Sequence, residues 1–259
     1  MRRFLQSALI LALTLVATSG VARATSYQLG QTFLNPSPAS GDNFGWSVAA
    51  VGNNVLVGAP DDDTGATNSG AAYLFDGDTG ALLLTFLNPT PFTGARFGYS
   101  VAALGNNVLI GAPGATIGGI NSGAAYLFDG TTGALLLTFL NPTPNAGDQF
   151  GLSVASVGAN VLVGAPRDDA GGTDAGAAYL FDGTTGALLQ TFMKPTPAAA
   201  DQFGMSVGAM GGNVLIGAIK DATLGVKHGA VYLFDTSGLL LETFLNPSPA
   251  LDDDFGWTV

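Results

Sequence analysis

Hydrophobic and polar residues alternate in short runs that return every 53 residues along the chain. In the copy that begins at Phe44, bulky and small residues alternate up to Val51, which is typical of a half-buried strand. Residues 55–57 are wholly apolar and predict a buried strand, and residues 71–75 and 82–87 predict a third and a fourth. Because tight turns rich in Gly, Asn and Asp separate several of these runs, the pattern predicts four short antiparallel strands in each unit.

Three signature sequences mark the unit. Phe-Gly begins at residues 44, 97, 150, 203 and 255, and Tyr-Leu-Phe-Asp begins at residues 73, 126, 179 and 232. Gly-Ala-Pro begins at residues 58, 111 and 164 and returns as Gly-Ala-Ile at residue 217. A fixed period of this kind indicates a repeat protein, in which each unit stacks on the next to bury its apolar face. Four strands in each unit are typical of a β-propeller blade, and no helical period is sustained.

The order Phe-Gly, Gly-Ala-Pro and Gly-Ala-x-Tyr-Leu-Phe resembles FG-GAP repeats, the blades of integrin α-subunit propellers and of many secreted bacterial proteins. The resemblance covers residues 25–259. It implies an all-β propeller of four-stranded antiparallel blades, as an incomplete ring. The complete blades are residues 44–96, 97–149, 150–202 and 203–254. Residues 25–43 are then the fourth strand of a partial blade, and residues 255–259 start a further blade.

The turns between the first and second strands depart from this family. Many FG-GAP blades carry an Asp-rich calcium loop there, and calcium takes six to eight oxygen ligands, several of them carboxylates. The corresponding turns here contain no carboxylate, at residues 52–54, 105–107, 158–160 and 211–213. We therefore expect no calcium at these turns and no cofactor.

Residues 1–24 are typical of a secretory signal peptide. Arg2 and Arg3 precede a ten-residue apolar segment, and residues 22–24 form a small-residue cleavage site. The apolar segment is too short to span a bilayer. We predict a signal-peptide helix, cleavage after Ala24, and a secreted, periplasmic or cell-surface protein with no membrane insertion after cleavage.

Charge narrows the choice of partners. All 19 acidic residues and five of the eight basic residues follow residue 24, which gives this part a formal net charge of −14. Such a surface repels phosphate backbones, so we expect no nucleic acid partner. The chain has no cysteine, so an exported form must be stable without disulfides.

An up-and-down blade places its loops on two faces. The short turns share one face, and the long second-to-third-strand loops and blade-to-blade loops share the other. Loops on a rigid scaffold commonly carry recognition, and these long loops differ most between copies, although solvated loops also drift. We predict that an extracellular protein or glycan binds this long-loop face. The candidate ligand-binding residues are Asp61, Asp62, Asp63, Phe92, Arg96, Arg167, Asp168, Asp169, Asp174, Lys220, Asp221 and His228.

Metal binding and catalysis find little support in the sequence. Weak metal candidates are Asp61, Asp63, Asp168 and Asp174, but without calcium-loop spacing a solvated acidic loop is favoured and we predict no metal site. His228 is the only histidine and is expected to be an exposed loop residue. We predict a non-catalytic binding or adhesion module. The alternatives are the propeller part of an extracellular hydrolase or lyase acting on polysaccharide, and a structural spacer in a larger surface protein.

Four acidic residues lie two positions before Phe-Gly and are expected to accept backbone N–H bonds in the turn: Asp42, Asp148, Asp201 and Asp253.

Four blades fall short of the seven-bladed ring usual for this family. We expect a piece of a longer propeller, two chains that complete one ring, or a tight four-bladed ring, and we favour the first. Unclosed blade edges would also permit self-association.

Overall fold

The computed structural model describes residues 30–223, 225, 227–250 and 253–259, so the predicted signal peptide lies outside the described residues. The described chain is all-β, with four four-stranded antiparallel sheets and one two-stranded sheet. None of the described residues forms a helix long and apolar enough to cross a membrane.

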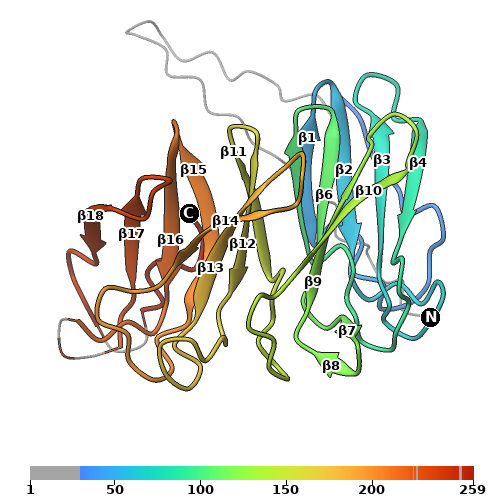
Figure 1. Cartoon of the computed structure of the whole chain (residues 1–259). Helices are drawn as coiled ribbons and strands as arrows, with labels where there is room; N and C mark the ends of the chain where they lie inside the picture. The colour runs from blue at the N-terminus through green and yellow to red at the C-terminus, as the bar shows by residue number, and fades with distance from the viewer. Residues whose placement is uncertain (1–29, 224, 226, 251–252) are drawn as a thin grey trace, which may run out of the picture.

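Each four-stranded sheet is one propeller blade, and its strands follow chain order from the inside of the arc to the outside (Figure 1). Blade 1 comprises β1 (Ser47–Val51), β2 (Asn54–Ala59), β3 (Ala71–Asp76) and β4 (Leu82–Leu87). Blade 2 comprises β5 (Ser100–Leu104), β6 (Asn107–Ala112), β9 (Ala124–Phe128) and β10 (Leu135–Leu140). Blade 3 comprises β11 (Ser153–Val157), β12 (Asn160–Ala165), β13 (Ala177–Asp182) and β14 (Leu188–Phe192). Blade 4 comprises β15 (Phe203–Met210), β16 (Asn213–Ala218), β17 (Ala230–Phe234) and β18 (Leu240–Leu245).

The fifth sheet is a small hairpin in the long loop of blade 2. Its strands are β7 (Thr116–Ile117) and β8 (Ile120–Asn121), which the sequence pattern did not predict. The antiparallel order of every blade places the short turns on one face and the long loops on the other, as the strand count predicted.

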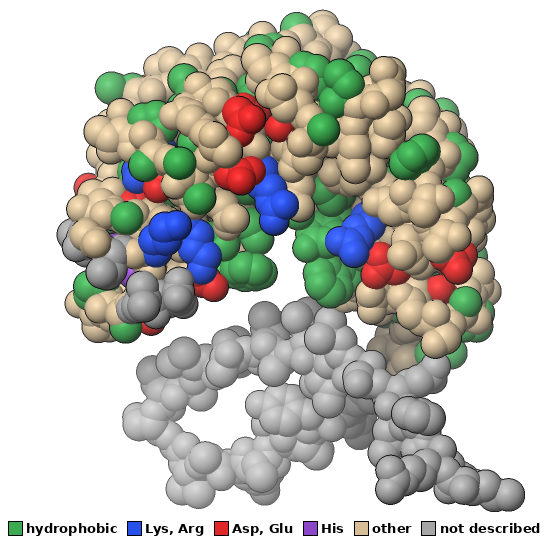
Figure 2. All heavy atoms as spheres, turned by 90° about the horizontal axis from the view of Figure 1, so that it is seen from below, with side chains coloured by type: hydrophobic (Ala, Val, Ile, Leu, Met, Phe, Trp, Pro, Cys, Tyr) green, Lys and Arg blue, Asp and Glu red, His purple; other side chains and the backbone are tan. Residues whose placement is uncertain are grey.

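The blades are arranged as an open arc. Their inner strands pack side by side in the order β1, β5, β11 and β15. Figure 2 shows the long-loop face, where the arc is hollow at its centre and stays open between blades 1 and 4. The expectation of a tight, closed four-bladed ring is therefore wrong for this structure.

The apolar core lies between neighbouring blades. Phe86 of β4 packs on Phe128 of β9 with ring centroids 5.2 Å apart, and both rings are buried. Phe97 of the second Phe-Gly packs edge-on against Phe128, with ring centroids 5.9 Å apart. Burying such a side chain contributes about 1.5–3 kcal/mol. The same arrangement recurs at the next two junctions, so each blade buries its faces only against its neighbours.

The signature glycines lie where one blade locks onto the next. Ser47 Oγ donates a hydrogen bond to the carbonyl oxygen of Gly98 in the next blade, at 2.8 Å. A Cβ atom at Gly58 would lie 2.0 Å from that same oxygen, so only glycine fits. Gly98 itself has φ +88° and lies against the carbonyl oxygen of Ala71. These contacts join the Phe-Gly-x-Ser and Gly-Ala-Pro sequences of neighbouring blades. Both sequences therefore have to recur once in every blade, which gives them the same period.

The two ends of the described chain differ from the complete blades. Residues 30–43 contain no strand, although a fourth strand was predicted over residues 25–43. Phe33 nevertheless packs on Phe75 with ring centroids 5.4 Å apart, which repeats the contact between Phe86 and Phe128. At the other end, Phe255 forms a parallel bridge with Gly229, as Phe97 and Phe150 do with Gly70 and Gly123 of the blade before them.

Candidate ligand-binding site

Three of the predicted loop aspartates are buried beneath the long loops. Asp62, Asp168 and Asp221 are each at most 2% exposed. Each accepts a hydrogen bond from the tyrosine of Tyr-Leu-Phe-Asp in its own blade, for example from Tyr73 Oη to Asp62 Oδ2 at 2.8 Å. Burial alone raises the pKa of Asp62, but hydrogen bonds from Thr64, Tyr73 and Ser37 outweigh it and lower that pKa. The expectation of a solvated acidic loop is wrong for Asp62 and Asp168, because they anchor their loops to the third strand, and Asp221 does the same in blade 4.

A second buried carboxylate adjoins this anchor at the junction of blades 2 and 3. Asn141 Nδ2 donates to Asp148 Oδ2 at 2.7 Å and to Asp168 Oδ2 at 3.0 Å. Burial raises the pKa of Asp148 to about 6, and the charges of Asp168 and other nearby aspartates also raise it. Asp148 accepts the backbone N–H of Asn145 at 2.7 Å, which confirms the turn role predicted from sequence. The other three aspartates at this repeat position accept equivalent backbone N–H bonds.

The same polar position varies from junction to junction. Between blades 3 and 4, Lys194 replaces the asparagine, and its Nζ lies 3.0 Å from carboxylate oxygens of both Asp201 and Asp221. Between blades 1 and 2, alanines 95 and 115 replace both carboxylates, and Asn88 Nδ2 is buried without a hydrogen-bond partner. These clusters hold the blades together and do not face solvent.

His228 is also buried, at 1% exposed, so the expectation of an exposed loop histidine is wrong. Its backbone N–H donates to the carbonyl oxygen of Asp221, and its carbonyl oxygen accepts the N–H of Phe255. The histidine occupies the repeat position of Ser69, which is buried in the first loop. Its backbone therefore joins blade 4 to the segment that follows it.

Charged pairs mark the inner rim of the long-loop face. At two junctions the residue before Phe-Gly pairs with the residue that follows Gly-Ala-Pro or Gly-Ala-Ile in the preceding blade. At the first junction Arg96 Nε lies 3.4 Å from Asp61 Oδ1, and at the last junction Lys220 Nζ lies 2.5 Å from Asp254 Oδ1. The signs of the two pairs are reversed. Figure 2 shows Lys and Arg side chains at the edge of the hollow, with hydrophobic side chains inside it.

A trough of about 420 Å³ runs along the inner strands of all four blades. The residue after each Phe-Gly lines it: Trp46, Tyr99, Leu152, Met205 and Trp257. The two tryptophans are 54% and 55% exposed, which is unusual for side chains of this size. The trough thus gathers an exposed apolar surface at the centre of the arc, and such surfaces commonly mark binding sites.

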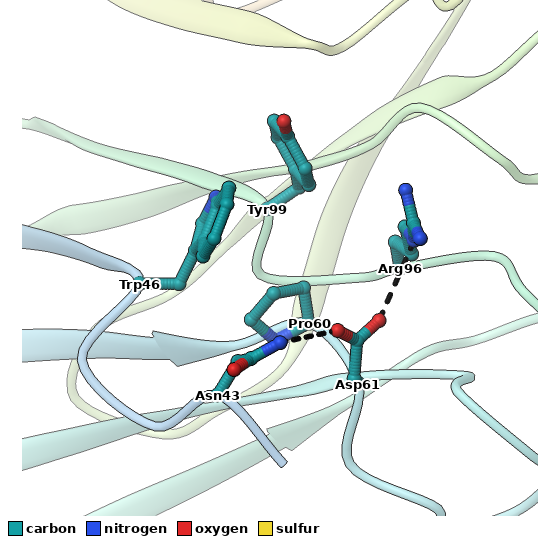
Figure 3. Close-up of a pocket in the computed structure, with 6 residues that line it drawn as sticks. All are labelled: Asn43, Trp46, Pro60, Asp61, Arg96 and Tyr99. Carbon is teal, nitrogen blue, oxygen red and sulfur yellow. Dashed lines mark hydrogen bonds and ion pairs between the residues drawn. The ribbon is translucent and has the colours of Figure 1, made fainter. Parts of the chain in front are cut away.

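A smaller pocket of about 220 Å³ opens at the blade 1 end of the trough (Figure 3). Trp46 and Tyr99 form one wall with ring centroids 5.3 Å apart, and Pro60 lies below them. Asn43, Asp61 and Arg96 form the polar part, which Figure 3 shows joined by two contacts.

Asp61 connects the polar side chains of this pocket. Asn43 Nδ2 donates to Asp61 Oδ2 at 2.5 Å. Asp61 Oδ1 is buried and accepts no hydrogen bond, although it lies in ion-pair distance of Arg96. Burial raises the pKa of Tyr99, so its hydroxyl stays protonated at neutral pH. The pocket therefore combines an aromatic wall with a neutral amide and with a carboxylate and a guanidinium of opposite charge.

The family model for the FG-GAP repeat matches residues 32–75, 92–128, 143–181 and 195–234. The chain belongs to the FG-GAP repeat family. A search of curated proteins found no match.

The remaining predicted residues lie at several different places on the FG-GAP loops. Asp61 and Arg96 line the small pocket at the blade 1 end of the trough, and Lys220 pairs with Asp254. Phe92 and Arg167 are exposed on the loops, and Arg167 makes no ion pair with any described residue. Asp63 and Asp169 accept the backbone N–H of Asn68 and Asp174 at 2.8 and 2.9 Å, so they shape their own loops. Within the described residues, no three acidic or histidine side chains converge as a metal site.

Sequence reasoning missed the aromatic side chains of the site. Trp46, Tyr99 and Trp257 each follow a Phe-Gly, and all five copies carry a bulky residue there. This regularity in the sequence marks the position after Phe-Gly as one where a bulky side chain is required. It did not show, however, whether the position faces a neighbouring blade or the centre of the arc, because both directions are compatible with the alternating pattern.

Proposed function

We propose that this FG-GAP propeller is a secreted, non-catalytic binding module that holds an extracellular protein or glycan at its long-loop face. One observation carries the proposal: the exposed rings of Trp46, Tyr99 and Trp257 line the trough at the centre of the arc. Concave sites with aromatic walls and a few convergent polar groups are the usual form of ligand sites.

Binding without chemistry agrees with the state of the carboxylates near the trough. Hydrolysis of a glycosidic bond commonly needs two carboxyl groups that flank it, one as acid and one as base or nucleophile. Asp61 is held by Asn43 and Arg96, and Asp254 is held by Lys220. These pairings favour a positioning role for the rim carboxylates.

Screening the chain from Thr25 onward against extracellular proteins and glycans tests the proposal. We expect binding that is lost in the double variant Trp46→Ala/Trp257→Ala and retained in a matched control, Leu136→Ala, on the outer strand β10. Binding that survives loss of both tryptophans would contradict the placement in the trough. Turnover of a polysaccharide that disappears in Asp61→Asn would instead support the hydrolase or lyase alternative.

A further inference from the structure

We infer that the pocket between blades 1 and 2 is a subsite for one neutral sugar ring of a glycan chain. The inference rests on the proposed function and names the ligand class. The pocket has a volume of about 220 Å³. This is smaller than the roughly 300–1,000 Å³ of sites that hold drug-sized ligands, so the pocket suits a ligand group of a single ring.

The aromatic wall suits the apolar face of a pyranose. Sugar rings present C–H groups on their faces and hydroxyls at their edges, so they pack flat against aromatic rings while their edges stay polar. Trp46 is half exposed, and its ring lies beside that of Tyr99 at an interplanar angle of 50°. The two rings line both the pocket and the trough, and Figure 3 shows them side by side above Pro60.

The polar wall suits the hydroxyls at the edge of the ring. Asp61 Oδ1 is buried 3.4 Å from Arg96 Nε, and Asp61 Oδ2 accepts from Asn43 Nδ2, so Asp61 fixes both side chains at the edge of the pocket. Asn43 uses its amide nitrogen on Asp61, and its carbonyl oxygen remains an acceptor, while the half-exposed Arg96 guanidinium offers further donors.

Charge decides between neutral and acidic sugars. Asp61 and Arg96 offset each other in the pocket, and the chain as a whole carries a formal charge of −11. A uronate would therefore gain little from the pocket and be repelled by the surrounding surface. A neutral ring avoids that repulsion and still uses every polar group of the pocket.

The equivalent junction between blade 4 and residues 253–259 offers a comparison within the same molecule. Met205 replaces Trp46 there, Trp257 replaces Tyr99, and the charged pair is reversed as Lys220 and Asp254. That junction lacks both the facing pair of aromatic rings and a carboxylate at the Asp61 position. It therefore lacks the two features that the inference assigns to a sugar subsite.

The test uses the variant Trp257→Phe, which leaves Trp46 as the only tryptophan of the chain. Titration with cellohexaose, mannohexaose, xylohexaose and polygalacturonate is followed by tryptophan fluorescence and by calorimetry. We expect at least one neutral oligosaccharide to change the Trp46 emission and to bind at least about tenfold more tightly than polygalacturonate, a difference of 1.4 kcal/mol. Tyr99→Ala and Asp61→Ala should each weaken binding about tenfold, whereas Leu136→Ala, on the outer strand β10, should leave it unchanged.

The outcomes separate this inference from the proposed function. If no neutral oligosaccharide binds but an extracellular protein binds and depends on Trp46, the sugar inference fails and the binding module stands. Sugar binding that is insensitive to Tyr99→Ala and Asp61→Ala also overturns the subsite. If neither sugars nor proteins bind, both proposals fail. Circular dichroism of every variant confirms that loss of binding is not loss of fold.

Discussion

Backbone groups at the junction of two blades approach too closely for any side chain. Gly58 and Gly98 come from neighbouring blades, and the Gly98 carbonyl oxygen occupies the space of a Gly58 Cβ. The Ser47 hydroxyl binds the same oxygen from the side. At residue scale, the repeat is therefore held by a backbone contact that only glycine permits.

Gly58→Ala should destabilise the protein by about 1–3 kcal/mol, because the added methyl group must push blade 2 away from blade 1. Gly212→Ala is the matched control, since a Cβ there meets nothing within 4 Å. Thermal unfolding followed by circular dichroism measures both. Equal midpoints for the two variants would contradict the interlock.

The buried Asp148 should make stability depend on pH. Its pKa is raised, mainly by burial, from 3.8 to about 6. Because the folded state holds the proton more tightly, this contribution to stability is fully present below pH 3.8 and is lost as the pH rises through about 6. We expect the unfolding temperature to fall between pH 4 and pH 7, and this fall to shrink in Asp148→Asn.

Asp129→Asn is the control for this pH profile. Asp129 lies in an exposed turn, where backbone N–H bonds from Thr132 and Thr131 lower its pKa below 3.8. Its contribution is lost only as the pH falls below that value, so the variant should keep the wild-type slope between pH 4 and pH 7. A D148N profile that parallels wild type would refute the assignment to Asp148.

At the scale of elements, the outermost strands β4, β10, β14 and β18 are the free edges of the blades. Their leucines are largely exposed, including Leu83, Leu136 and Leu189, and β4 and β10 contain no charge. Edge strands usually carry charges that prevent pairing with another chain. Only β18 has one, Glu242, which is exposed.

Adding charge to these edges should reduce self-association. In the triple variant Leu83→Lys/Leu136→Lys/Leu189→Lys, we expect fewer concentration-dependent oligomers and an unfolding midpoint close to wild type, because these side chains are exposed. Conversely, Glu242→Leu should increase oligomers. Light scattering across a concentration series measures both changes, and unchanged scattering in both variants would rule out the edges as the contact.

At the scale of the whole molecule, the open arc makes the junctions unequal. Phe139 of β10 is 1% exposed between blades 2 and 3, whereas Phe244, at the same repeat position in β18, is 41% exposed. The inner part of blade 4 is covered by residues 255–259, but its outer part has no neighbour among the described residues. In a repeat protein each unit is stabilised by its neighbours, so the outer part of blade 4 should open first.

Phe139→Ala should therefore cost about 3–5 kcal/mol, as expected for a fully buried ring, and Phe244→Ala should cost much less. Urea denaturation of the two variants compares them directly. Hydrogen exchange should show faster exchange in β18 than in β10. Similar costs for both substitutions would mean that the outer part of blade 4 is covered in solution.

The repeat, the four strands of each blade and the division into a short-turn and a long-loop face could all be predicted from the sequence. These follow from alternation, tight turns and a fixed period, which are local properties of the chain. The ends were less predictable, since residues 30–43 have the pattern of a fourth strand and form none.

Which polar residues face solvent, and where a ligand fits, depends on how neighbouring blades pack and could not be predicted from the sequence. Asp61, Asp62 and Asp63 are consecutive, yet the first lines a pocket, the second is buried against Tyr73 and the third holds its own loop. The pocket combines Asp61 with Arg96 and Trp46 with Tyr99 across the junction of two blades. The arc and the angle between blades set these distances, and both arise from packing between units that each repeat, read alone, does not contain.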